Sequence, residues 1–233
     1  MEQNERSIAP VAYIRTELKN KFGIPRQSGR VPSLKGRIEF VPKWRNPAAI
    51  REIEAFSHLW LIFDFSKAHR DDPSPTVRPP RLGGNKKVGV FASRSPFRPN
   101  SLGLSCVKLE SVEHTADCGD VLIVSGVDLL DGTPIYDIKP YIPYADCIED
   151  AVGGYADGQA HHSLKLDFPE ELYMKVPEGS RTALCDLIQE DPRPSYQSDP
   201  EREYTITFGG VEVDFHIDGD TARVYCVRPP RKA

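Results

Sequence analysis

The chain has 233 residues, of which 39% are hydrophobic and 27% charged, and its net charge at pH 7 is −4. It contains no run of about 20 apolar residues, the length that a membrane-spanning helix needs, and residues 1–7 are polar. We therefore expect no membrane span, no secretory signal and a cytoplasmic location. Five scattered cysteines without a CxxC pair, and histidines without ligand spacing, predict neither disulfides nor a metal site.

The two parts of the sequence carry opposite charge. Residues 1–110 contain 20 Lys and Arg against 10 Asp and Glu, whereas residues 111–233 contain 10 against 24. The basic part can offer a positive face to a polyanion such as nucleic acid. An equal alternative is that the two parts neutralise each other across a contact within the fold.

Short β-branched and aromatic runs separated by turn residues dominate the first part. The 21 prolines argue against long helices and favour an all-β barrel or sandwich. One helix is expected over residues 47–55, because Asn46 can cap it and Pro47 suits its first position. The predicted strands are residues 11–15, 36–40, 58–65, 88–91, 105–109 and 121–130.

The composition changes near residue 151, where Gly, Ala, Asp and His dominate (AVGGYADGQAHHS). Such a stretch is typical of a linker or a surface segment. We expect residues 1–147 to complete a β-barrel domain, residues 148–163 to form a linker, and residues 164–233 to form a smaller α+β domain. The predicted elements of this second domain are a helix over residues 178–190 and strands over residues 203–208, 211–217 and 222–227.

Several common signatures are absent from the sequence. Its paired glycines fit neither the GxGxxG nor the P-loop pattern, and its strands do not alternate with helices as a doubly wound sheet requires. There is also no GxSxG motif. A Rossmann cofactor site and the usual hydrolase classes are therefore disfavoured.

A rigid, arginine-bearing segment follows the predicted strand over residues 88–91. In GVFASRSPFRPNSLG (residues 89–103), Arg94 and Arg98 lie four residues apart and are accompanied by Pro96 and Pro99. Guanidinium groups bind carboxylate or phosphate through a planar fork, and a pre-set backbone loses less entropy when a ligand binds. We favour a ligand-binding role over the alternative of a structural turn with its arginines in solvent.

Two other segments combine rigid turns with polar side chains. FGIPRQSG (residues 22–29) offers backbone and amide groups to a polar small molecule, and DGTP (residues 131–134) precedes an extended run with three tyrosines. Aromatic residues interleaved with polar groups suit stacking on a nucleobase. Taken alone, each segment also fits an ordinary connection or core strand of a barrel.

In order and spacing, FGIPRQSG, FSHLWLIFDF, GVFASRSPFRPNSLGLS and DGTPIYDIKPYIPYAD resemble the TrmO, or TsaA-like, family over residues 8–147. DPRPSY (residues 191–196) resembles a motif of the longer bacterial members. The resemblance implies a TsaA-like β-barrel that uses S-adenosylmethionine (SAM) to methylate N6 of threonylcarbamoyladenosine at position 37 of tRNA. It also implies threonine tRNAs as substrates, and a homodimer.

The resemblance assigns the SAM contacts residue by residue. They are Pro25, Arg26, Gln27, Ser66, Lys67, Arg94, Leu104, Asp131, Gly132, Thr133 and Pro134. Many members have His-Gln in place of Ser66-Lys67, and a frequent Pro-Ile is replaced by Ser101-Leu102. The residue types suit the ligand, because the zwitterionic end of SAM and its adenine need polar forks, backbone donors and an apolar slot.

The acceptor nitrogen must lose a proton during methyl transfer, a reaction in which positioning provides most of the acceleration and no metal is needed. The candidate bases close to DGTP in sequence are Asp131, Asp137, Tyr141, Tyr144 and Asp146. The sequence does not choose among them, so the catalytic residue is left open.

A basic loop, RPPRLGGNKK (residues 78–87), precedes the arginine-bearing segment. We expect Arg78, Arg81, Lys86 and Lys87, together with Arg98, to bind tRNA phosphates, and the alternative is a solubilising loop. Two other functions stay open at this point. One is a non-enzymatic RNA-binding module, and the other is a SAM-dependent methyltransferase of a small molecule.

Overall fold

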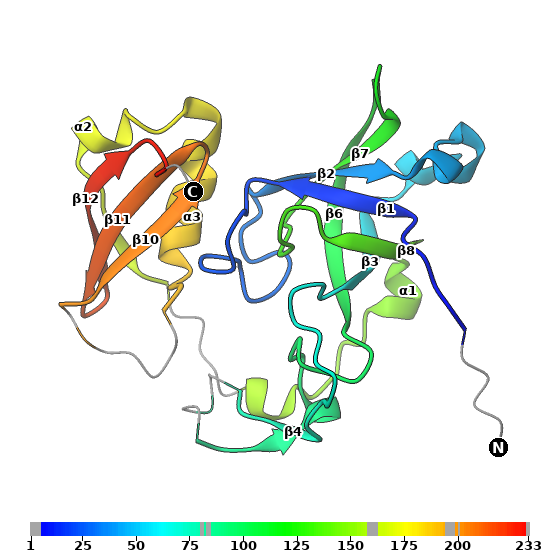
Figure 1. The fold of residues 1–233 in the computed structure, drawn as a ribbon, viewed down its shortest axis with the longest axis horizontal. Coiled ribbons are helices and arrows are strands. Elements are labelled where there is room, and N and C mark those ends of the chain that lie inside the picture. The colour runs from blue at the N-terminus through cyan, green and yellow to red at the C-terminus, as the bar shows by residue number, and fades with distance from the viewer. Residues whose placement is uncertain are drawn as a thin grey trace.

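The structure is a computed structural model that describes residues 6–79, 82, 85–157, 163–193, 199 and 201–231. Two units lie side by side (Figure 1): a β-barrel, and a smaller sheet with helices. The expectation of a mainly β protein is confirmed. Within the described ranges, no helix is long and apolar enough to cross a membrane.

Six antiparallel strands form a closed barrel in the order β1-β2-β7-β6-β3-β8. Buried and exposed residues alternate along β1, as expected when one side of each strand faces a core. The strands are β1 (Ala12–Thr16), β2 (Lys35–Phe40), β3 (His58–Asp64), β6 (Leu102–Thr115), β7 (Gly119–Ser125) and β8 (Pro134–Pro140). A separate short hairpin pairs β4 (Thr76–Val77) with β5 (Val88–Gly89).

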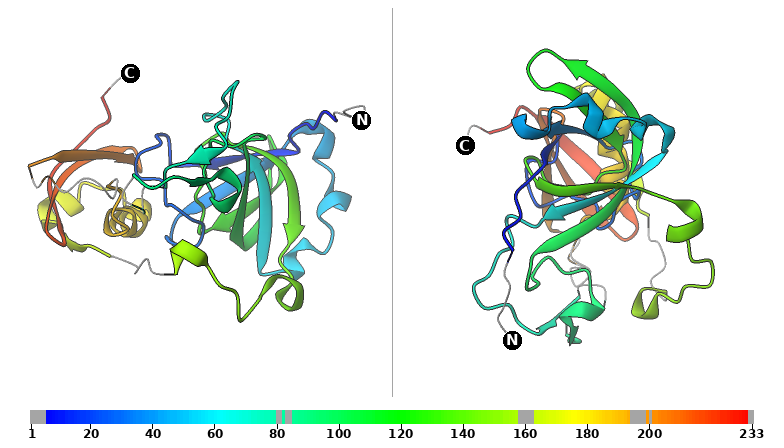
Figure 2. Two further views of the ribbon diagram at one scale, coloured as in Figure 1. Left: turned by 90° about the horizontal axis from the view of Figure 1, so that it is seen from below. Right: turned by 90° about the vertical axis from the view of Figure 1, so that its right-hand side faces the viewer.

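The second unit is a four-stranded sheet in the order β10-β11-β12-β9, with β9 parallel to β12. Helix α3 lies against one face of this sheet (Figure 2), because Ala183, Leu184, Leu187 and Ile188 form its buried apolar side. The elements are β9 (Lys165–Asp167), α2 (Glu170–Tyr173), α3 (Arg181–Gln189), β10 (Glu203–Phe208), β11 (Val211–Asp218) and β12 (Thr221–Arg228). A further helix, α1 (Pro143–Asp146), follows β8. Among the described residues, the 3-10 turns are Pro42–Trp44, Pro47–Ile50, Ile53–Ala55, Val90–Ala92, Gly154–Ala156 and Glu178–Ser180.

The helix expected over residues 47–55 is wrong. Asn46 does cap the segment, since its side chain accepts a hydrogen bond from the Ala48 amide at 3.0 Å. Only two 3-10 turns form, because Glu52 between them adopts a left-handed conformation with φ 65°, which a continuous helix does not allow.

Other boundaries also differ from those expected. The strand predicted over residues 88–91 ends at Gly89 and continues as a 3-10 turn, and the strand predicted over residues 105–109 extends over the whole of β6. The strand predicted over residues 121–130 ends at Ser125, because Gly126 turns the chain with φ 70°. The helix predicted over residues 178–190 begins at Arg181, after a 3-10 turn.

The C-terminal unit packs against the connection between β1 and β2. Buried side chains of both units belong to one apolar cluster. Polar contacts to α3 and to the residues that flank it surround this apolar cluster. Arg30 pairs with Glu190 at 3.0 Å, Ser33 donates to Asp186, and Ser180 donates to Glu17. The segment FGIPRQSG lies within this same connection, so the second unit is in position to brace it.

Candidate active site

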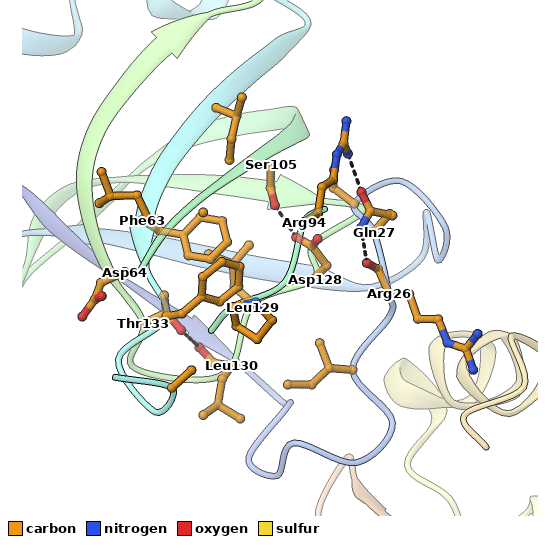
Figure 3. Close-up of a pocket in the computed structure, with 18 of the residues that line it drawn as sticks. Arg26, Gln27, Phe63, Asp64, Arg94, Ser105, Asp128, Leu129, Leu130 and Thr133 are labelled. Atoms are coloured by element: carbon orange, nitrogen blue, oxygen red, sulfur yellow. Dashed lines mark hydrogen bonds between the residues drawn. The ribbon is translucent and has the colours of Figure 1, made fainter. Parts of the chain in front are cut away.

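A cavity of about 830 Å³ opens at one end of the barrel (Figure 3). Two loops form much of its wall: residues 22–29, which we name the PRQ loop, and residues 93–101, which we name the arginine loop. The rest comes from the end of β3 with residues 65–68, the start of β6, and residues 128–133 between β7 and β8. Segments far apart in the sequence thus meet around one space.

The arginine loop is braced by its own atoms. The Ser93 hydroxyl donates to the Val90 carbonyl at 2.8 Å, and Arg98 Nη1 donates to the Ser93 carbonyl at 3.2 Å. The Ser101 amide donates to the Arg98 carbonyl at 3.1 Å, and Ser101 has a left-handed φ of 49°. Arg98 therefore lines the cavity with its guanidinium held against its own loop.

The two loops are joined by a hydrogen bond across the cavity. Arg94 Nη1 donates to Gln27 Oε1, and Gln27 Nε2 donates to the Arg26 carbonyl (Figure 3). Both side chains line the cavity. The pair presents a guanidinium fork and an amide to any ligand between the loops.

Arg26 takes a different direction. Its guanidinium donates to the backbone carbonyls of Asp191 at 3.4 Å and Arg193 at 2.6 Å, in the C-terminal unit, and points away from the cavity (Figure 3). Asp191 is itself paired with Arg193 at 2.8 Å. Partial burial by itself would raise the pKa of Asp191, but the hydrogen bonds from Arg193 outweigh it and hold that pKa below its usual value.

The DGTP turn is attached to β1. Asp131 accepts the Thr16 amide at 3.0 Å and pairs with Lys19 at 2.7 Å. Partial burial would raise the pKa of Asp131, but these partners lower it on balance. Gly132 turns the chain with φ 75° and donates its amide to the Ile14 carbonyl at 2.8 Å. The carboxylate of Asp131 thus stabilises the turn.

The expected SAM contacts divide into two groups. Those that line the cavity are Pro25, Arg26, Gln27, Ser66, Lys67, Arg94, Leu104 and Thr133. Asp131, Gly132 and Pro134 do not line it, but their neighbour Thr133 does, and the Thr133 hydroxyl donates to the Leu130 carbonyl at 2.7 Å.

The other candidate bases, Asp137, Tyr141, Tyr144 and Asp146, lie outside the cavity lining. Arg78, Lys86 and Lys87 are exposed and also lie outside it, and Arg81 falls outside the described residues. Among the described residues, no group of three or more His, Cys, Asp or Glu side chains is placed to hold a metal ion.

Two carboxylates in the cavity wall were missed at the sequence level. Asp128 accepts a hydrogen bond from the Ser105 hydroxyl at 2.6 Å, and burial raises the pKa of Asp128. Asp64, which is 6% exposed, lies 2.7 Å from His69 Nε2. A sequence signal existed for both, since each is an acidic residue at the end of an apolar run (HLWLIFD and VLIVSGVD).

The apolar side of the cavity depends on a glycine. Phe63 on β3 pairs with Gly103 on β6, and its ring lies so close that a β-carbon at residue 103 would meet it at 2.3 Å. Phe65 packs edge-on against Phe63, with ring centroids 5.0 Å apart. Phe63, Leu129 and Leu130 lie across the cavity from Arg94 and Gln27 (Figure 3), and Phe65 also lines it, so these side chains supply an apolar wall.

This arrangement defines a class of protein. A closed barrel carries, at one end, a cavity with guanidinium and amide groups on one side and aromatic and aliphatic groups on the other. Such a site suits a polar organic cofactor with an apolar portion, and it is built without a doubly wound sheet.

The family follows from comparison with known proteins. Residues 13–147 match the tRNA-methyltransferase O N-terminal domain, and residues 162–230 match the TrmO C-terminal domain. The chain belongs to the tRNA-methyltransferase O family, so the resemblance noted from the motifs is confirmed.

Relatives and solved structures agree with this assignment. The tRNA (adenine(37)-N6)-methyltransferase of Escherichia coli is 36% identical over 228 residues, which cover 94% of this chain and 96% of the relative. The enzyme of the same name from Eikenella corrodens is 44% identical over 174 residues, covering 74% and 97%. The crystal structure of TrmO from Pseudomonas aeruginosa superimposes with a TM-score of 0.80 at 34% identity, covering 98% of this chain and 99% of that one.

Proposed function

We propose that this protein transfers a methyl group from SAM to N6 of the adenine at position 37 of tRNA, the activity for which its E. coli and Eikenella corrodens relatives are named. The observation that carries the proposal is the cavity, which is formed by the segments that match the family motifs. The proposed substrate nucleoside is threonylcarbamoyladenosine in threonine tRNAs.

The cavity fits SAM in size and in chemistry. Its volume of about 830 Å³ lies within the range of small-molecule sites. Arg94 and Gln27 would hold the charged amino-acid end, and the backbone of Pro25 and Arg26 would offer further polar groups. When bound, SAM supplies an electrophilic methyl group on a sulfonium. The remaining task of the protein is to orient the acceptor nitrogen and to exclude water.

We propose that the basic loop binds the phosphates of the tRNA. Arg78 directly follows β4, and Lys86 and Lys87 directly precede β5, so the hairpin fixes both ends of the loop. All three side chains are exposed. Exposed cations on a loop that leads into the arginine loop are suited to a polyanion bound beside the methyl donor.

We also propose a homodimer and a cytoplasmic location, where tRNA is found. Leu102 and Leu104 on β6 support the dimer, since they are 36% and 57% exposed where they line the cavity. The proposed domains are residues 1–147 and 164–233, joined by residues 148–163. Light scattering at micromolar concentration and limited proteolysis test these two points. A monomeric mass, or first cleavage within residues 88–109, would contradict them.

Methylation of purified tRNA tests the proposed function. The protein is incubated with tRNA and SAM carrying a labelled methyl group, and the nucleosides are then separated by mass spectrometry. We expect label in N6-methylated threonylcarbamoyladenosine. A parallel incubation with a metabolite mixture tests the small-molecule alternative, and SAM binding by calorimetry without methylation of tRNA would favour a non-enzymatic RNA-binding protein.

A further inference from the structure

The cavity wall contains two carboxylates, and their settings differ. Asp64 lies at the end of β3 and is 2.7 Å from the exposed His69. Its carboxylate lies at the edge of the group of side chains drawn in Figure 3. Asp128 instead lies between Ser105 and Arg94, on the side of the cavity where the two loops meet (Figure 3). Asp128 is therefore the carboxylate that a ligand between the loops would encounter.

The hydrogen bonds of Asp128 hold its carboxylate in place without saturating it. The Ser105 hydroxyl donates to Oδ1 at 2.6 Å, and the backbone amides of Ser28 and Asp128 also donate to the carboxylate. Ser105 is 2% exposed, so this partner is fixed in the barrel wall. An ionised carboxylate offers about four acceptor positions, so three donors leave one for an N–H of a ligand.

Burial gives the carboxylate of Asp128 a higher than usual affinity for a proton, although its polar neighbours favour the ionised form. Burial raises the pKa of Asp128, whereas its hydrogen bonds and the charge of Arg94 lower it, with burial dominating. The other titratable groups in the cavity lining are Lys21, Arg26, Lys67, Arg98, Asp64 and the Cys106 thiol. A carboxylate whose pKa is shifted towards neutrality is a better general base than an ordinary one.

We propose that Asp128 is the proton acceptor of the methylation, an inference that rests on the proposed function. As the N6 lone pair of the adenine forms the new N–C bond, the C–S bond of the sulfonium breaks with its electron pair staying on sulfur. The N6 proton passes to the carboxylate of Asp128. Ser105 is a positioning residue, because it holds Oδ1 in the direction of the cavity.

The test compares Asp128→Asn with the wild type in three measurements. The rate of tRNA methylation should fall by about 100-fold or more, the scale of general-base catalysis, and the acid limb of its pH profile should disappear. SAM affinity by calorimetry should change far less than the rate, because this variant keeps Arg94 and Gln27, the pair proposed to hold the amino-acid end of SAM. Asp120→Asn is the matched control, since Asp120 pairs with His114 on the β6–β7 hairpin outside the cavity lining.

Ser105→Ala keeps the carboxylate and gives a second readout. Since the Ser105 hydrogen bond lowers the pKa of Asp128, its loss should move the acid limb of the rate to higher pH. The carboxyl carbon of Asp128, followed by NMR in the ligand-free protein, should titrate at correspondingly higher pH. This measurement does not depend on the activity of the loaded enzyme.

The outcomes separate the two proposals. If the wild type methylates tRNA and Asp128→Asn does so at a similar rate, Asp128 is not the proton acceptor although the proposed function stands. If the rate and the SAM affinity fall together, the carboxylate holds the ligand's ammonium group, and the inference is again overturned. If the wild type does not methylate tRNA at all, the proposed function fails and this inference fails with it.

Discussion

The arginine loop and the PRQ loop, which face each other across the cavity, are similar in composition but are held in place by different parts of the chain. Each combines proline with arginine in a short turn. The arginine loop takes its internal hydrogen bonds from residues 90–101. The PRQ loop is held by the C-terminal unit through Arg26 and Phe22. The Phe22 ring stacks on Tyr204 with ring centroids 5.9 Å apart. A rigid wall can thus come from local sequence or from a partner far along the chain.

Removing the bridge between the loops should have the largest effect. Arg94→Ala deletes both the bond to Gln27 and the proposed contact to SAM, so SAM binding and methylation should fall together. A charge-assisted contact contributes about 1.5–3 kcal/mol, which corresponds to roughly 10-fold to 100-fold in affinity. Calorimetry on the folded variant checks this. Arg51→Ala, an exposed arginine between the 3-10 turns, is the control, and unchanged SAM affinity in Arg94→Ala would contradict the assignment.

Releasing the PRQ loop from the C-terminal unit should have an intermediate effect. Arg26→Ala removes two hydrogen bonds to backbone carbonyls, which together contribute about 1–2 kcal/mol to stability. Because the loop then loses an anchor, SAM affinity should fall by up to roughly 10-fold.

Arg45→Ala is a matched control for this change, since Arg45 also donates to two backbone carbonyls, those of Phe40 and Asp117, outside the cavity lining. It should lower stability in urea unfolding to a similar extent and leave SAM affinity alone. Equal SAM affinities for both variants would show that the C-terminal unit does not support the cofactor wall.

Neutralising the basic loop, which leads into the arginine loop, should affect tRNA binding alone. Lys86→Ala/Lys87→Ala should weaken tRNA binding and reduce its salt dependence by roughly one unit of slope per lost phosphate contact, without changing SAM affinity. Titrations at several salt concentrations measure this. Lys165→Ala/Lys175→Ala removes the same charge from the C-terminal unit as a control. If tRNA binding has the same salt dependence in the wild type and the Lys86/Lys87 variant, the loop is solvated and does not contact phosphates.

The smallest effect concerns the pH dependence of the long-range anchor. The pKa of Asp191 is lowered in the folded state, so its stabilising contribution is present above the ordinary carboxyl range and is lost as the pH falls through the folded pKa. The difference in unfolding free energy between wild type and Asp191→Asn should be constant near neutral pH. It should shrink as the pH falls below about 4. A difference that grows on acidification would contradict this account.

The sequence predicted the locally determined parts of the molecule. Alternating apolar residues gave most barrel strands, and the proline spacing gave the rigid arginine loop. It could not give the direction of Arg26, because the carbonyls that bind this side chain lie 165 and 167 residues further on. It also could not show that Asp131 is engaged by β1, or that Asp128 and Ser105, 23 residues apart, would meet in the cavity.

The contact between Phe63 and Gly103 has an evolutionary consequence. Because any side chain at residue 103 would overlap the Phe63 ring, residue 103 can gain volume only if residue 63 loses it. The two residues are paired across neighbouring strands, so this exchange is confined to one rung of the barrel. Within the family, these two positions should therefore covary, with a small residue at one accompanying a large residue at the other.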